Sequence, residues 1–408
     1  MYAHDNRRYK HNNSVGKSMM KLKKATAVFI CLIILAVLFC GFTAAEGDDG
    51  GDYEKNDTAA LYSEQLEASG AKGLYDILDP ETKSLLSSFG ISLSDPSSLG
   101  QITPGQIFSL LLSYIGELIK TPLSVAGGIM CTALICSLIG AFGCSSAENT
   151  ELFRFITSLI IALITALPLF SLIKKLADAA LSLGNFMLSF VPIYSGILAC
   201  AGKRCLAASY NAMAFMACEL IYSAAERLIV PVGGMYIALC CAGELTPNTG
   251  FSGLTLSLKK AACFALGILM TVFTGIMTVS GFVSASSDTL TAKTARFLVG
   301  SLIPVVGPAM SESLSAITGA MSLLKGTVGV FGAIAGIGII IPVLISLTLW
   351  RISLCLALCS CEILGLGSAS GIVRNIGSAV SIFLAVTVCF AALFIISLSC
   401  VISVGGLL

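Results

Sequence analysis

Acidic side chains that lie within long apolar stretches are the residues of this sequence best placed to do chemistry. Glu219, Glu312 and Glu362 each stand among uncharged neighbours, deep in an apolar run. An ionisable group at bilayer depth is costly, and such groups often mark ion or substrate pathways. Glu226 and Glu244 lie next to charged or turn-forming residues and are better explained as the ends of spans. The three deeper acids are therefore candidate intramembrane residues.

Proline and glycine interrupt two of the apolar runs. The first interruption holds Pro192 and Gly196, and the second holds Pro304, Gly307 and Pro308. Because such residues leave backbone N–H and C=O groups unpaired, protein or a water-filled cavity must supply partners where lipid cannot. We therefore expect a re-entrant hairpin at the second interruption, with a kinked ordinary helix as the alternative.

The two interrupted runs also resemble each other, which is the sequence sign of the repeats found in transporters. Chance similarity is the alternative, because the shared stretch is short. If the repeat is real, the two segments face each other near the membrane centre and line a polar path. The candidate path-lining or structural-break residues are Pro192, Gly196, Pro304, Gly307, Pro308 and Glu312.

The sequence lacks the signatures of common catalytic and cofactor sites. It has no Walker A sequence, no HExxH motif and no Gly-x-Ser-x-Gly elbow. Its two histidines, His4 and His11, precede the first apolar stretch, so a histidine-based zinc site or a Ser-His-Asp triad is excluded from the mature chain. We predict no enzymatic activity, no catalytic residue, no metal site and no cofactor.

Composition places the chain in a membrane. Of its 408 residues, 56% are hydrophobic and only 12% are charged, whereas a soluble domain is about one-quarter charged. Lipid must therefore cover much of the surface. The sixteen cysteines lie mostly in or beside apolar runs, where they are best explained as small buried hydrophobic residues.

The N-terminus has the three parts of a secretory signal. Basic residues at 17–24 precede an apolar stretch at 25–42, and small residues then lead to Ala45 and a run of acids. Cleavage after Ala45 is expected, which makes residues 1–45 a tail and signal peptide. The alternative is a first transmembrane helix that is not removed.

Two short regions separate the signal from the membrane domain. Residues 46–102 carry twelve acids against three lysines and are expected to be extracytoplasmic, with 46–60 disordered. Asp79 and Pro80 predict the start of a helix that Gly90 ends. This region is too poor in large apolar side chains to fold alone, so it should pack on a partner or on the membrane domain. Residues 103–122 are expected to form an amphipathic interfacial helix.

The remaining residues, 123–408, are expected to form a polytopic membrane domain. Its linkers carry basic residues almost equally on both sides, so they do not fix the orientation. Seven spans are predicted near 123–143, 155–173, 205–225, 228–243, 262–283, 326–350 and 376–404. Three further stretches, 185–201, 297–324 and 352–368, are apolar but broken or short.

The stretch TLTAKTARFLVGSLIPVVGPAMSESLSAITGAMSLLKGTVGVFGAI at 289–334 resembles the stage III sporulation protein AE family. The resemblance extends over most of the chain, from the signal and the short acidic region to the multi-span domain. It implies an all-α integral membrane protein, a multi-span helical bundle with Pro/Gly-broken re-entrant segments, distantly similar to autoinducer-2 exporters. The family has no established catalytic residues to transfer.

The resemblance also implies partners and a location. These are other membrane proteins of the same stage III sporulation operon, among them a secretion-type ATPase and ring-forming proteins, together with a forespore membrane partner. The expected site is the mother-cell-derived membrane around the forespore. The function implied is a permease-like subunit of a channel complex needed for late forespore development. A stand-alone secondary transporter or exporter of a small molecule, and a structural scaffold for ring-forming partners, are the alternatives.

Overall fold

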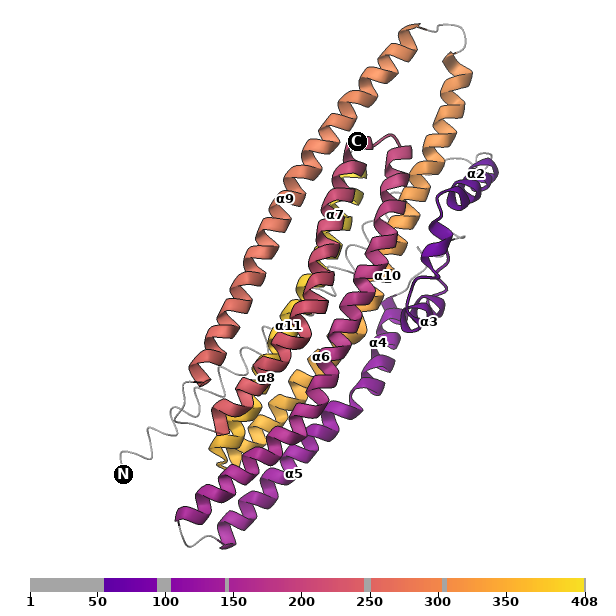
Figure 1. The fold of residues 1–408 in the computed structure, drawn as a ribbon. Coiled ribbons are helices and arrows are strands. Elements are labelled where there is room, and N and C mark those ends of the chain that lie inside the picture. Colours follow the sequence, from indigo (N-terminus) through magenta and orange to yellow (C-terminus); the bar gives the residue numbers. More distant parts are fainter. Residues whose placement is uncertain (1–54, 94–103, 144–146, 246–250, 303–306, 407–408) are drawn as a thin grey trace. The chain divides into compact units, whose positions relative to one another are not determined.

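The computed structural model describes residues 55–93, 104–143, 147–245, 251–302 and 307–406 (Figure 1). For 291–302 and 307–319 it describes the backbone alone. The chain divides into two units, Met1–Lys55 and Asn56–Leu408, and the helical fold is that of the second unit. Ala45 and the expected signal peptide lie outside the described residues, so cleavage after Ala45 stays a prediction.

Helices make up the regular structure of the described part of the chain, and no strand occurs there. A short N-terminal group contains α2 (Lys55–Ala68), the 3-10 turn η1 (Ala71–Leu74) and α3 (Pro80–Ser88). The following helices are α4 (Pro104–Leu118), α5 (Lys120–Gly143), α6 (Ala147–Cys200), α7 (Arg204–Ala224), the π-helical turn η3 (Ala225–Ile229), α8 (Val230–Leu245), α9 (Phe251–Leu302), α10 (Gly307–Ile363) and α11 (Gly367–Gly406).

Six of these helices are long and apolar enough to cross a membrane, within the residues that the structure describes. They are α5, α6, α7, α9, α10 and α11, and they confirm the expected all-α, multi-span class. α8 is apolar but shorter than a typical span. The segment predicted as a span near 228–243 is therefore a helix, but a short one.

Contrary to the expectation from the sequence, proline does not break α6. The predicted span at 155–173 and the broken stretch at 185–201 belong to one helix of 54 residues, with Pro168 and Pro192 inside it. A proline removes one backbone donor, and neighbouring groups in a helix bundle can satisfy the freed carbonyl. The carbonyl that Pro192 leaves without its N–H partner is that of Leu188, four residues earlier. α6 nevertheless continues through Pro192, whose own carbonyl accepts the Ser195 hydroxyl at 3.0 Å. The break predicted at Pro192 is therefore wrong.

Small residues let neighbouring helices approach closely. Gly184 of α6 packs against Tyr222 of α7, and Gly233 of α8 packs against Ile173 of α6. Glycines of α10 do the same for aromatic rings, and Gly336 lies directly against the Phe394 ring of α11. Such small-residue contacts are the usual way that apolar helices pack when lipid is the alternative neighbour.

Within the N-terminal group, α3 begins and ends as the sequence predicts, and the group packs on the helical domain. Asp79 occupies the N-cap position of α3, Pro80 is its first residue, and Gly90 follows its end with φ +65°, which glycine adopts without strain. The Tyr62 hydroxyl donates to the Leu93 carbonyl at 2.7 Å and ties α2 to the end of this group. Because α2 begins at Lys55, the part of 46–60 from that residue on is helical rather than disordered.

α4 begins at Pro104, as expected, and leads almost directly into α5 at Lys120. The boundary between the two helices is therefore the single turn residue Ile119, across which the helical hydrogen bonds continue. That α4 is an amphipathic helix lying at the membrane surface stays a prediction.

Candidate functional site

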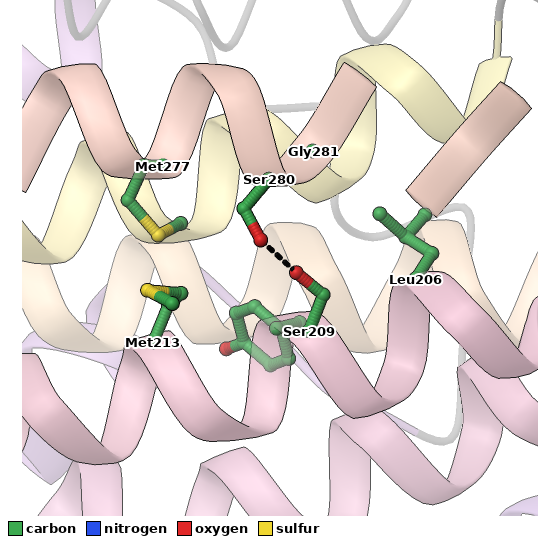
Figure 2. Close-up of a pocket in the computed structure, with 7 residues that line it drawn as sticks. Leu206, Ser209, Met213, Met277, Ser280 and Gly281 are labelled. Atoms are coloured by element: carbon green, nitrogen blue, oxygen red, sulfur yellow. Dashed lines mark hydrogen bonds between the residues drawn. The ribbon is translucent and has the colours of Figure 1, made fainter. Parts of the chain in front are cut away.

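The contact between α7 and α9 brings polar side chains together between two apolar helices. The hydroxyls of Ser209 and Ser280 form a hydrogen bond across it, and Met213 faces Met277 beside that bond (Figure 2). A small pocket follows this contact, lined also by Leu206, Tyr210 and Gly281. Unbranched methionine side chains adapt to changing gaps. We call this contact, from Leu206 to Met213 on α7 and from Met277 to Asp288 on α9, the α7–α9 seam.

Asp288 closes one end of the seam by capping α7. Its carboxylate accepts the backbone N–H of Cys205 and of Leu206, each at 2.9 Å. A carboxylate at a helix N-terminus satisfies otherwise unpaired donors and complements the positive end of the helix dipole. Burial lowers the pKa of the neighbouring Lys203, and the Asp288 carboxylate opposes that shift. Asp288 thus joins α9 to the turn between α6 and α7.

A column of aromatic rings fills the bundle behind the seam. Phe186, Phe190 and Tyr194 stack at ring-centroid distances of 5.5 and 5.2 Å, and Tyr194 meets Tyr210 edge to face at 5.6 Å. The Tyr194 hydroxyl is fully buried and has no hydrogen-bond partner among the described residues. The inward side of α6 at this height is therefore mainly aromatic packing.

The predicted path-lining residues are only partly described. Pro192 and Gly196 lie on the exposed side of α6, while Tyr194 and Ser195 between them are buried. Pro304 lies outside the described residues, and Gly307 is the first residue of α10. The structure does not describe the side chains of Pro308 and Glu312. A re-entrant hairpin or a polar path at these residues stays a prediction.

The candidate acids occupy different positions and do not form one cluster. Glu219 is exposed on α7. Glu362, at the end of α10, accepts a hydrogen bond from the Arg374 guanidinium of α11 at 2.6 Å. Glu244, at the end of α8, accepts from the Asn375 amide at 2.9 Å. Glu362 and Glu244 therefore join helix ends, and a transport role for Glu219 or Glu362 stays a prediction.

The N-terminal group is held on the helical domain by one polar and several apolar contacts. The Ser182 hydroxyl of α6 donates to the Asp79 carboxylate at 3.2 Å. Thr82 and Leu85 of α3 lie against Gly338 of α10, where an added Cβ would meet the Thr82 methyl at 3.2 Å. Leu85 and Leu86 are buried. Residues 55–93 thus pack on the helical domain, as expected, and their inability to fold alone stays a prediction.

Within the described part of the chain, no group of three or more His, Cys, Asp or Glu side chains could hold a metal ion. The cysteines described there are free thiols. The polar groups that the seam offers are the two hydrogen-bonded hydroxyls and the carboxylate that caps α7.

Sequence reasoning missed the seam because its partners are far apart in the chain. Ser209 and Ser280 are separated by 71 residues, and Asp288 lies 83 residues from Cys205. Asp288 is an acid beside an apolar run, and no local pattern indicates which helix it caps. Hydroxyl residues in apolar runs are common, so nothing marked the two serines.

Comparison with known proteins gives one family. The family model described as Stage III sporulation protein AE matches residues 95–405. A curated relative, Stage III sporulation protein AE of Bacillus subtilis (strain 168), is 23% identical over 316 residues, which are 74% of this chain and 79% of that protein. No solved structure matches the chain. The family match covers α4 to α11 and leaves out α2, η1 and α3.

Proposed function

Because the chain belongs to the stage III sporulation protein AE family, its role is in sporulation, and we propose that it is the permease-like membrane subunit of a transport complex that links mother cell and forespore. Its partners in this proposal are other membrane proteins of the same operon, a secretion-type ATPase, ring-forming proteins and a forespore membrane partner. Its location is the mother-cell-derived membrane. No enzymatic step and no cofactor form part of the proposal.

The length of the helices is the observation that supports this proposal most directly. α6, α9 and α10 contain 54, 52 and 57 residues. At 1.5 Å per residue they extend about 80 Å, more than twice the roughly 30 Å of bilayer hydrocarbon. A subunit that connects two facing membranes needs a part that extends beyond its own bilayer. A stand-alone transporter has no such requirement.

The α7–α9 seam supports the permease-like part of the proposal. Two polar contacts hold α9 to α7, the Ser209–Ser280 bond and the Asp288 cap. Hydrogen bonds between hydroxyls can exchange with water or a polar solute at little net cost. Movement of α9 relative to α7 would then open a polar passage between otherwise apolar surfaces.

A test of the seam uses sporulating cells that carry Ser280→Leu. The larger apolar side chain removes the bond to Ser209 and fills the pocket, so a late forespore reporter should fall at least tenfold while membrane levels stay normal. Ser286→Leu is the matched control, because the Ser286 hydroxyl is exposed and bonds only within its own helix, to the Phe282 carbonyl at 2.8 Å. An unchanged reporter in Ser280→Leu would contradict a transport role for the seam.

The complex itself is tested by copurification of the cross-linked chain from sporulating cells, with mass spectrometry of the bound proteins. Recovery of the secretion-type ATPase and ring-forming proteins is the expected result. If the chain is recovered alone and moves a solute in proteoliposomes under an ion gradient, it is a stand-alone transporter instead.

A scaffold role is the second candidate, and the exposed charges of the N-terminal group favour it. Glu64, Glu67, Asp76 and Glu81 are exposed and could bind a soluble partner. The seam variant separates the two roles. If Ser280→Leu keeps the partners bound but loses the reporter, the chain transports; if every loss of reporter activity follows a loss of partners, it is a scaffold.

A further inference from the structure

The bilayer can cover only about two-fifths of the longest helices, α6 and α10, given their lengths. Charged and apolar side chains are unevenly distributed along these helices. Their distribution, compared at equal heights on neighbouring helices, identifies the part that lies in the hydrocarbon.

Lys120, the first residue of α5, lies level with a basic pair on α6. Gly128 of α5 packs against Ile164 of α6, and Figure 1 shows the two helices running side by side as the two arms of a hairpin. Because the two helices run in opposite directions, a residue eight positions before Gly128 on α5 lies level with a residue about eight positions after Ile164 on α6. This places Lys120 within a turn of Lys174 and Lys175, and all three lysines are exposed.

Arg227 and Lys260 lie near the same height on the other side of the bundle. Gly233 packs against Ile173 of α6, so Arg227, six residues before Gly233, lies less than two turns from that height. The seam sets α9 antiparallel to α7 and brings Lys260 opposite the η3 turn. Both side chains are exposed. We call Lys120, Lys174, Lys175, Arg227 and Lys260 the basic belt.

On one side of the basic belt the exposed surface of α5 and of the first part of α6 is apolar. The Glu362–Arg374 pair, at the end of α10 and the start of α11, also lies on this side, with the Arg374 side chain 55% exposed. Fifteen large apolar side chains are exposed on α5 and on the first part of α6, among them Leu134, Leu138, Leu163 and Phe170. Between Arg154 and Lys174 no residue of α6 is ionisable. This stretch of helix extends about 30 Å, the thickness of bilayer hydrocarbon.

On the other side of the basic belt the surface carries charge. The N-terminal group lies there, because Asp79 bonds to Ser182 and Thr82 touches Gly338. Its outward side chains include exposed acids and lysine, which hydrocarbon does not tolerate. Glu219 of α7 is exposed at a similar height, since Gly184 of α6 packs against Tyr222, three residues further along α7.

From this distribution we infer that the bilayer surrounds the α5–α6 hairpin end of the bundle, with the basic belt at one membrane surface. The lysines and arginine then reach the phosphates of lipid headgroups, as such residues do at the ends of membrane helices. Residues 55–93, the seam and the segments of α6 and α10 beneath the N-terminal group lie outside the hydrocarbon. The passage proposed at the seam would then run through the part of the bundle that extends beyond the bilayer. The inference itself does not depend on the proposed function.

A placement one bilayer thickness further along the helices is the alternative. It would use the exposed apolar stripe of α9, which includes Phe264, Val279 and Phe282. It would also put Glu219 and the charges of the N-terminal group into lipid, and it would leave the fifteen exposed apolar side chains of the α5–α6 hairpin in water. The larger exposed apolar surface favours the first placement. The charges that this placement brings into the hydrocarbon, Glu244, Glu362 and Arg374, are hydrogen-bonded between helix ends.

Two leucines of α6 allow a matched test. Leu163 and Leu188 are exposed to 58% and 44%, and they lie on opposite sides of the basic belt. Each is replaced by cysteine, as Leu163→Cys and Leu188→Cys, in an otherwise cysteine-free full-length chain that still supports sporulation. Each cysteine then receives a nitroxide spin label, and the protein is reconstituted into vesicles of phosphatidylglycerol and phosphatidylethanolamine.

The ratio of two collision rates, with oxygen and with a water-soluble nickel chelate, reports whether each label lies in lipid or in water. We expect the oxygen-to-nickel ratio to be at least tenfold higher at Leu163→Cys than at Leu188→Cys. A ratio that is equal at both sites, or higher at Leu188→Cys, would overturn the inference. The readout is independent of transport, so a failed Ser280→Leu test would leave it unaffected.

Discussion

Replacement of Asp288 should detach α9 from the start of α7. The carboxylate is buried, with 8% of its surface exposed, and accepts two backbone N–H groups. Asp288→Ala removes both bonds and the charge at the helix N-terminus. Loss of a helix cap costs about 0.5–2 kcal/mol, and bonds to a charged acceptor contribute about 1.5–3 kcal/mol each. Because the donors regain some water when α9 moves, we expect a total loss of about 2–4 kcal/mol.

Asp288→Asn gives a graded comparison. The amide keeps one acceptor oxygen but loses the charge, so it can satisfy only one of the two N–H groups well. The expected loss is about 1–2 kcal/mol, roughly half that of Asp288→Ala. If the amide variant were the worse of the two, the carboxylate would not act as a cap.

The single tryptophan of the chain provides the assay. Trp350 is buried in α10, with 4% of its surface exposed, so its emission changes when the bundle opens. Thermal unfolding of the purified chain in detergent should give a midpoint several degrees lower for Asp288→Ala than for the unaltered protein. Ser286→Ala, two residues away on the exposed side of α9, is the control and should stay within about 0.5 kcal/mol. Equal midpoints for Asp288→Ala and Ser286→Ala would refute the capping argument.

Three further predictions test helix packing, the Glu362–Arg374 ion pair and removal of the signal peptide. Gly336→Leu should lower the yield of monodisperse protein in size-exclusion chromatography, because its side chain meets an aromatic ring of α11 and overpacking costs about 1–3 kcal/mol or more; Gly326→Leu, where nothing lies within 4 Å, should not. Glu362→Gln should change the unfolding midpoint little, since the Arg374 side chain that it pairs with is 55% exposed and such pairs contribute up to about 1 kcal/mol; a large loss of sporulation at normal protein levels would instead indicate a transport role. Ala45→Trp should retain the precursor in immunoblots, and N-terminal sequencing of the unaltered membrane protein that still shows Met1 would contradict signal removal.

Local sequence patterns determined much of the secondary structure. The Asp79–Pro80 start and the Gly90 end of α3 could be read directly, because an N-cap, a proline at the first helical position and a left-handed glycine each act within a few residues. Pro104 marked the start of α4 for the same reason. The class of a multi-span helical protein also followed from the sequence, since length and hydropathy are properties of a single segment.

Sequence patterns also led to one wrong expectation about helix continuity. Pro192 was expected to break its segment, because proline removes a donor. In the structure α6 continues through it. Whether a proline kinks, breaks or is absorbed by a helix depends on the groups around it, and those come from several parts of the chain.

Contacts between distant residues were decided by the tertiary structure alone. The Asp288 carboxylate caps α7 through the N–H of Cys205, 83 residues earlier in the chain, and no local pattern indicates that contact. Glu362 was conspicuous as a deep acid, and the structure places it at a helix end, paired with Arg374. The sequence determines which segments become helices because each one satisfies its own backbone. It does not by itself show which side chains meet, because that depends on the register in which the folded helices pack against each other.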